Sequence, residues 1–205
     1  MLIDSTPAVE RVWRKWAEER GFDPATVISD AHGRPSISTI REYLPDGDHD
    51  AENREVERRE IEDTEGIIPL AGALALLQAL PLDRWAIVTS CTRALAEVRV
   101  RAGGLPLPCQ FLTSSEVTNG KPHPEPYIKG AGMLGFSPQD CVVLEDAPAG
   151  IRSGRAAGAR VIALRTTAPD SELREAGADW ILDDCSGVSL SVESGGLLLT
   201  LADGK

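Results

Sequence analysis

The chain of 205 residues has few aromatic residues, few lysines and no long apolar segment. No apolar run approaches the roughly 20 residues that a membrane-spanning helix needs. Met1 is followed by Leu-Ile-Asp, and not by a basic and then apolar leader, so we expect no signal peptide. These absences predict a cytoplasmic protein that makes no contact with membranes.

Cysteine is also scarce. The four cysteines are widely spaced, and no two of them form a Cys-x-x-Cys pair. This spacing is not typical of a zinc motif, and a disulfide framework is not expected in a chain of this length. We therefore expect reduced thiols.

Basic residues are outnumbered by acidic ones, 21 to 32, so the formal net charge is -11. Such acidity argues against nucleic acid as a partner and against anionic membrane surfaces. An anionic substrate would have to be held by local groups. Lys121 is one of only four lysines and belongs to no basic run.

Residues 6–66 are charged and have the apolar spacing of helices. Val9, Val12, Trp13 and Trp16 recur at intervals of three and four, which places them on one helix face. Segments 38–44 and 50–64 predict two more helices, and Pro24 is interpreted as a break. We expect a small helical cap of three helices over residues 6–66.

Residues 1–5 and 67–205 are expected to form the core. From Ile67 onward, short apolar runs alternate with helical segments, a rhythm typical of βαβ units and a parallel sheet. The predicted fold class is α/β: a Rossmann-like parallel sheet with helices on both faces, plus the helical cap. Segments 188–192 and 197–201 predict a C-terminal β-hairpin.

Polar residues follow two of the predicted strands. Thr89 and Ser90 come after the run 85–88, where a hydroxyl and free N–H groups at a helix start can cradle an anion, although such residues are also ordinary helix caps. Glu145 and Asp146 end the run 141–144 and predict a Mg²⁺ site; a helix start that favours acidic residues is the alternative. Lys121, in a Gly-Lys-Pro loop, could converge on them or lie in a surface turn. The small residues from Ala147 to Ile151 predict a helix that packs close to the sheet.

Together these residues resemble the haloacid dehalogenase superfamily of phosphatases, within the subfamily IA-like branch of sugar-phosphate and glycerol-phosphate phosphatases and β-phosphoglucomutases. Thr89 matches the second motif of the family, Lys121 the third, and Glu145 with Asp146 the fourth. The resemblance implies that Thr89 and Lys121 act on the phosphoryl group and that Asp146 and Glu145 hold Mg²⁺.

The first motif of the family, Asp-x-Asp-Gly-Thr/Val, has no match. Aligned on the following Asp4-Ser5, Met1 falls on the Thr/Val position, so the nucleophile would lie four residues before Met1 and the acid/base aspartate two before. The central strand that carries them would be absent, which leaves open edges on the strands ending at Thr89 and Leu144. A miscalled start, a truncated paralogue, or a strand supplied by the tail 197–204 are the alternatives.

The resemblance implies hydrolysis of a small sugar or polyol phosphate through an aspartyl-phosphate, provided that the aspartates exist in the intact protein. His32 and Arg34, with Ser90, are the candidate substrate-binding residues. A catalytically dead module that binds phosphate or a partner, and a mutase-like phosphotransferase, remain alternatives; Val9 stands where the mutases carry a histidine. We expect a monomer or a homodimer.

Overall fold

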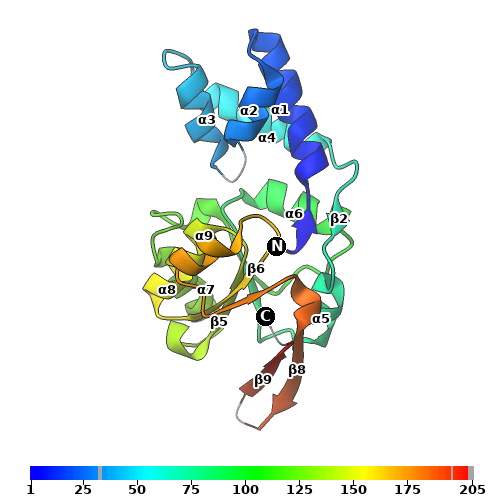
Figure 1. Cartoon of the computed structure of the whole chain (residues 1–205), viewed down its shortest axis with the longest axis vertical. Helices are drawn as coiled ribbons and strands as arrows, with labels where there is room; N and C mark the ends of the chain where they lie inside the picture. Colours follow the sequence, from blue (N-terminus) through cyan, green and yellow to red (C-terminus); the bar gives the residue numbers. More distant parts are fainter. Residues whose placement is uncertain (32–33, 195, 203–205) are drawn as a thin grey trace.

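The computed structural model describes residues 1–31, 34–194 and 196–202. Figure 1 shows three parts along the long axis: a helical unit at the top, an α/β unit below it, and a hairpin at the bottom. Within the described ranges, no helix is long and apolar enough to cross a membrane.

The described part of the helical unit contains four helices where three were expected. They are α1 (Thr6–Arg20), α2 (Pro24–Ala31), α3 (Ser36–Tyr43) and α4 (His49–Glu62). The predicted break at Pro24 is present, because α1 ends at Arg20 and Pro24 is the first residue of α2, a position where its missing N–H costs nothing. The additional helix is α2, which was not predicted. The predicted apolar face of α1 is confirmed: Val12, Trp13 and Trp16 pack in the core of this unit.

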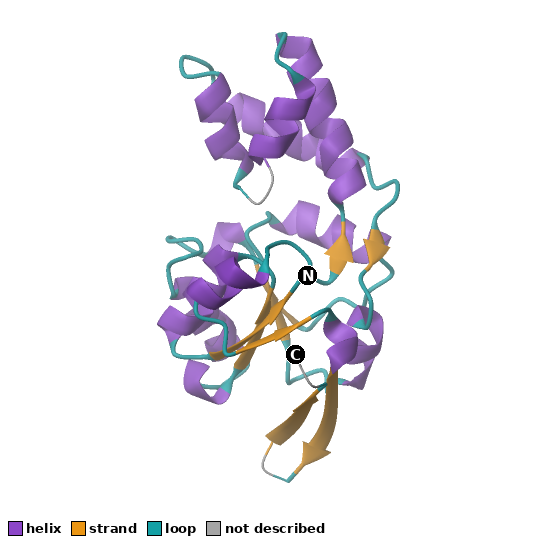
Figure 2. Cartoon of the chain, viewed as in Figure 1, coloured by secondary structure: helices purple, strands orange, loops and turns teal. Residues whose placement is uncertain are grey.

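The α/β unit alternates strands and helices as the sequence predicts (Figure 2). Its elements are α5 (Ala73–Ala79), β3 (Ala86–Val88), α6 (Arg93–Ala102), β4 (Gln110–Leu112), α7 (Glu125–Met133), β5 (Val142–Glu145), α8 (Pro148–Ala157), β6 (Arg160–Leu164), α9 (Asp170–Glu175) and β7 (Trp180–Leu182). Alternate residues of β6 point to opposite faces. Val161 and Ala163 pack with α8 and α9, whereas Ile162 and Leu164 pack with α5 and α6, so helices cover both faces.

The strands form two separate parallel sheets. β3 pairs with β4, and β6 lies between β5 and β7. Among the described residues no strand joins β3 to β5, so each has a single partner, as the missing first motif predicts. Both edges line a cavity of about 950 Å³, which we call the sheet gap.

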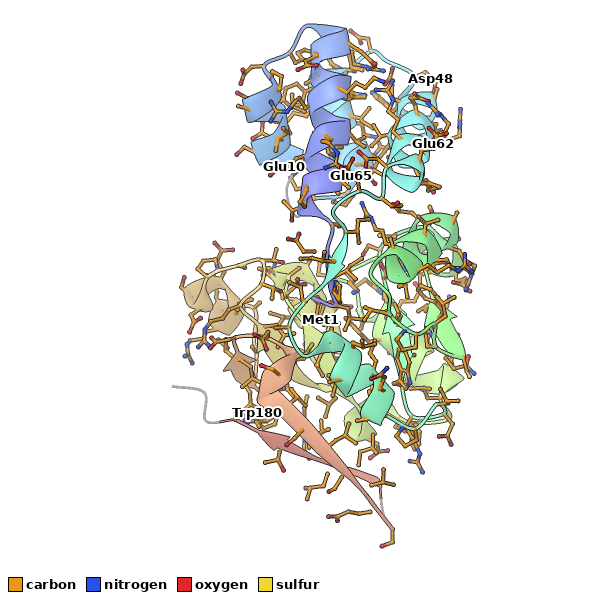
Figure 3. The ribbon with its side chains drawn as sticks, turned by 90° about the vertical axis from the view of Figure 1, so that its right-hand side faces the viewer. Met1, Glu10, Asp48, Glu62, Glu65 and Trp180 are labelled. Carbon is orange, nitrogen blue, oxygen red and sulfur yellow. The ribbon has the colours of Figure 1, made fainter. Side chains whose placement is uncertain are left out.

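Two antiparallel ribbons complete the described chain. β1 (Ile3–Asp4) pairs with β2 (Ile68–Pro69) where the helical unit joins the α/β unit, and strands of two residues are too short to show a pattern in the sequence. In Figure 3, Met1 lies at this junction, below Glu65. The predicted hairpin is confirmed as β8 (Val188–Glu193) and β9 (Gly196–Leu201). Because β9 pairs with β8, the tail does not supply the central strand, and that alternative was wrong.

Helix α4 also contacts helix α6 through polar groups. Arg99 Nη2 lies 3.3 Å from the Glu60 carboxylate, and the two side chains are only 14% and 11% exposed. The Thr92 hydroxyl donates to Glu57. Burial raises the pKa of Glu60 above its usual value, against the opposing charge of Arg99. The helical unit is therefore held to α6 by a pair of charges withdrawn from water, and to the residue that precedes α6 by the Thr92 hydroxyl.

Replacing Arg99 with Met tests this contact. The change leaves Glu60 without its counter-charge, so we expect a loss of about 3 kcal/mol in unfolding free energy at about pH 8. A carboxyl whose pKa is raised in the folded state binds its proton more tightly there, so the loss should shrink as the pH falls to about 5. Urea unfolding of both proteins at about pH 8 and at about pH 5 measures this change in unfolding free energy. Arg101→Met removes an exposed pair with Glu97 on the same helix and should cost less than about 1 kcal/mol. Equal losses for the two variants would contradict the argument.

Candidate functional site

The first part of the site is the turn after β3. Thr89 continues the pairing of β3, because its N–H donates to Leu112 O at 3.0 Å. Its hydroxyl accepts a bond from the Cys91 N–H at 3.2 Å, which folds the chain toward α6. Ser90 is exposed on this turn and lines the sheet gap. A strand end that passes directly into a helix start places hydroxyls and N–H groups where an anion can approach.

Lys121 joins the two sheets at their carboxyl ends. Its Nζ donates to the carbonyl oxygen of Val88, the last residue of β3, at 3.0 Å. It also donates to Glu145 Oε1, on the last residue of β5, at 2.5 Å. The lysine side chain is 13% exposed. The structure thus places this loop residue between the two strand ends and not on an outer surface turn.

The Glu145 carboxylate is almost buried and fully engaged. Oε1 accepts from Lys121 and from the Tyr127 hydroxyl, each at 2.5 Å. Oε2 faces the backbone N–H groups of Asp146 and Ala147 at 3.1 and 3.5 Å, at the start of α8. A Cβ on Gly150 would lie 2.1 Å from Glu145 Cδ, so only glycine leaves room for the carboxylate. This contact is one place where α8 packs closely on the end of β5, as the small residues predicted.

Asp146 lies beside Glu145 but in a different set of contacts. Its Oδ2 accepts from the Met1 ammonium at 2.6 Å and from the hydroxyls of Thr166 and Thr167 at 2.9 and 2.7 Å. Burial alone would raise the pKa of Asp146, but the Met1 ammonium and the two hydroxyls hold it below its usual value. The carboxylate therefore stays ionised in this arrangement.

This donor set can be compared with the needs of Mg²⁺, which binds one or two carboxylates and takes its other oxygens from phosphate and water. The ionised Asp146 fits that requirement. Glu145 is committed to Lys121, and its predicted role at the metal stays a prediction. Across the part of the chain that the structure describes, no three His, Cys, Asp or Glu side chains form a metal cluster.

Two residues that the sequence did not single out hold the lysine loop. Glu125 accepts the N–H groups of Thr118 and Asn119 at 2.8 and 2.9 Å. The buried Ser153 hydroxyl donates to His123 O at 2.6 Å. Glu125 opens α7, where an acidic residue is ordinary, and Ser153 is a lone serine in a helix of small residues. Neither carried a motif that could have marked it.

Two candidate substrate residues, His32 and Arg34, belong to the helical unit. His32 falls outside the described residues. Arg34 is exposed, and its Nη2 pairs with Glu42 at 2.9 Å. Its role in binding substrate stays a prediction.

A doubly wound α/β unit with a separate helical unit, and with a hydroxyl, a lysine and a carboxylate at its strand ends, defines a class of enzyme that handles phosphate groups. Residues 2–158 match the family model "haloacid dehalogenase-like hydrolase". The chain belongs to this family, and by family it is an enzyme, a hydrolase of the phosphatase type. The resemblance inferred from the motifs is confirmed.

Among curated proteins, the chain is 42% identical to Hexitol phosphatase A of Escherichia coli over 95% of this chain and 92% of that protein. It is 37% identical to Glycerol-1-phosphate phosphohydrolase 2 of Saccharomyces cerevisiae, over 88% of this chain and 77% of that protein. Among solved structures, a HAD family hydrolase from Deinococcus radiodurans with bound phosphate and sodium matches with a TM-score of 0.68 and 26% identity, over 90% and 87% of the two chains. The α/β fold class is confirmed by these likenesses.

Replacing Gly150 with Ala tests the packing of Glu145. The new methyl group would displace the carboxylate from Lys121 and Tyr127 and leave a buried charge poorly paired, so we expect a loss of about 3 kcal/mol in unfolding free energy. Gly132→Ala is the control, because a Cβ at that position of α7 meets nothing within 4 Å. It should stabilise the protein by up to about 1 kcal/mol. Urea unfolding that ranks the two variants equally would refute the assignment.

Proposed function

We propose that this protein hydrolyses a small phosphate monoester, a sugar or polyol phosphate, with the help of Mg²⁺. The observation that carries this proposal is the position of Lys121, which joins the ends of β3 and β5 next to Thr89 and Asp146. The two curated relatives support it, because their names describe phosphatases of hexitol and glycerol phosphates.

Thr89 and Ser90 would bind phosphoryl oxygens through their hydroxyls and through the N–H groups at the start of α6. Lys121 would place its positive charge against the same oxygens and offset the charge that develops as the bond to phosphorus breaks. Since the chain is acidic overall, with a net charge of -11, these local groups must outweigh the general field.

Asp146 is the residue that would hold Mg²⁺, together with substrate and water oxygens. When bound, the ion would supply further positive charge to the phosphoryl group. The hydroxyls of Thr166 and Thr167, which donate to Asp146 Oδ2, would orient that carboxylate toward the ion.

The attacking aspartate, in this proposal, lies four residues before Met1, and the acid/base aspartate lies two before. Reaction through an aspartyl-phosphate then follows from the family resemblance. The sheet gap supports this placement, because residues 1–3 line it between the unpaired edges of β3 and β5. Within the described residues, the indole N–H of Trp85, which also lines the gap, is buried without a partner.

The helical unit would act as the cap and select the substrate. His32 and Arg34 are its candidate binding residues. In this role Arg34 would exchange its exposed partner Glu42 for an anionic or hydroxyl group of the substrate, at little cost because both side chains are exposed.

The test is Mg²⁺-dependent phosphate release from a panel of sugar and polyol phosphates. It compares the 205-residue chain with a chain extended upstream by the in-frame codons. We expect turnover only in the extended chain, and the upstream bases should encode Asp-x-Asp-Gly. Turnover by the 205-residue chain would move the nucleophile to another carboxylate, Asp4 first. Phosphate binding without turnover by either chain would favour the binding module.

Replacing Lys121 with Met should lower kcat/KM of the active chain by roughly 10²- to 10³-fold, because the charge that faces the phosphoryl oxygens is lost. Lys15→Met, on the exposed face of α1, is the control and should leave kcat/KM unchanged. Steady-state kinetics on the best substrate of the panel measures both. A fall of less than threefold in Lys121→Met would remove the lysine from the mechanism.

A further inference from the structure

The Tyr127 hydroxyl is a polar group of the site that the proposed reaction does not use. Tyr127 lies on α7, six residues after Lys121, and its hydroxyl donates to Glu145 Oε1 at 2.5 Å. The same oxygen accepts the Lys121 ammonium. The ring also lies beside the lysine, with Nζ 5.0 Å from its centroid. Tyr127 therefore contacts Lys121 twice, once directly and once through a shared carboxylate.

The four hydrogen-bonding positions of the Glu145 carboxylate are taken by this arrangement. Lys121 and Tyr127 occupy Oε1, and the N–H groups of Asp146 and Ala147 face Oε2. A carboxylate has about four lone-pair sites, so little capacity remains for another ligand. The backbone of Gly150 packs directly against this carboxylate, since Glu145 Cδ occupies the space that a Cβ at position 150 would need.

The direction of the bond is fixed by its chemistry. The phenol supplies the proton and a carboxylate oxygen accepts it, so Tyr127 acts as the donor to Glu145 Oε1.

We propose that Tyr127 is a positioning residue: through Glu145 it fixes the direction of the Lys121 ammonium toward the gap between the ends of β3 and β5. Glu145 then serves Lys121 as its fixed counter-ion. The ammonium has three donors, of which Val88 O and Glu145 take two. The third is left for the phosphoryl group, a step that rests on the proposed function.

The small number of lysines permits a direct test. Selective ¹⁵N labelling of the four lysine side chains gives at most four ammonium signals, and Lys121→Arg identifies that of Lys121. Hydrogen bonding and burial slow the exchange of ammonium protons with water, so the Lys121 signal should be the most persistent. Tyr127→Phe keeps the ring and removes only the hydroxyl. We expect its Lys121 signal to broaden or vanish.

Inorganic phosphate, titrated calorimetrically into the same proteins, measures the consequence for binding. Loss of one hydrogen bond to the charged cluster should weaken phosphate binding about tenfold. Tyr43→Phe is a matched control, because Tyr43 is the only other tyrosine and its hydroxyl donates to Asp30 at 2.6 Å in the helical unit. This control should change neither readout. Glu145→Gln is a second test variant and should also remove the Lys121 signal.

An unchanged Lys121 signal in folded Tyr127→Phe would overturn the proposal, as would equal losses in Tyr127→Phe and Tyr43→Phe. If Tyr127→Phe does not fold, persistence of the signal in Glu145→Gln overturns it instead. A lost signal with unchanged phosphate affinity would support the positioning of Lys121 and refute its part in binding phosphate. The positioning role of Tyr127 and the phosphate-binding role of Lys121 can therefore fail separately.

Discussion

The bond network of Lys121 is the interaction on which the site depends. The α/β unit is divided into two sheets that share no backbone hydrogen bond among the described strands. Lys121 bridges them, with one bond to the end of β3 and one to the end of β5. A single ammonium thus links the two strand ends, which Thr89 and Asp146 directly follow.

Burying this ammonium has consequences for its neighbours. A charge withdrawn from water must be paired and hydrogen-bonded, which accounts for the close contact with Glu145. The carboxylate in turn needs Tyr127 and the N–H groups at the start of α8, and it fits only because position 150 is glycine. The need to pair the buried Lys121 ammonium therefore constrains the residue types at positions that lie far apart in the sequence.

Local patterns predicted most of the elements and part of the site. Alternating apolar runs identified the strands, and the single lysine in its Gly-Lys-Pro loop was a correct candidate for convergence on Glu145. Pro24 correctly marked a break, but α2 was missed because a proline that interrupts a helical segment and one that begins a new helix look alike in sequence. Tyr127 was not singled out as a site residue, since its hydroxyl contacts a residue 18 positions away in the sequence.

The sheet gap connects these observations to activity. One face of the two sheets is closed by a shared apolar cluster, in which Trp85 and Phe111 meet Ile162 and Leu164, so the halves stay together without a strand between them. That packing, with Lys121 at the carboxyl end, keeps the edges of β3 and β5 facing a common cavity. A strand added between them would pair on both sides and end beside Lys121 and Asp146, because parallel strands present their carboxyl ends at one edge of a sheet. The groups proposed to bind phosphate are therefore arranged around the sheet gap, at the place where the proposed nucleophile would enter.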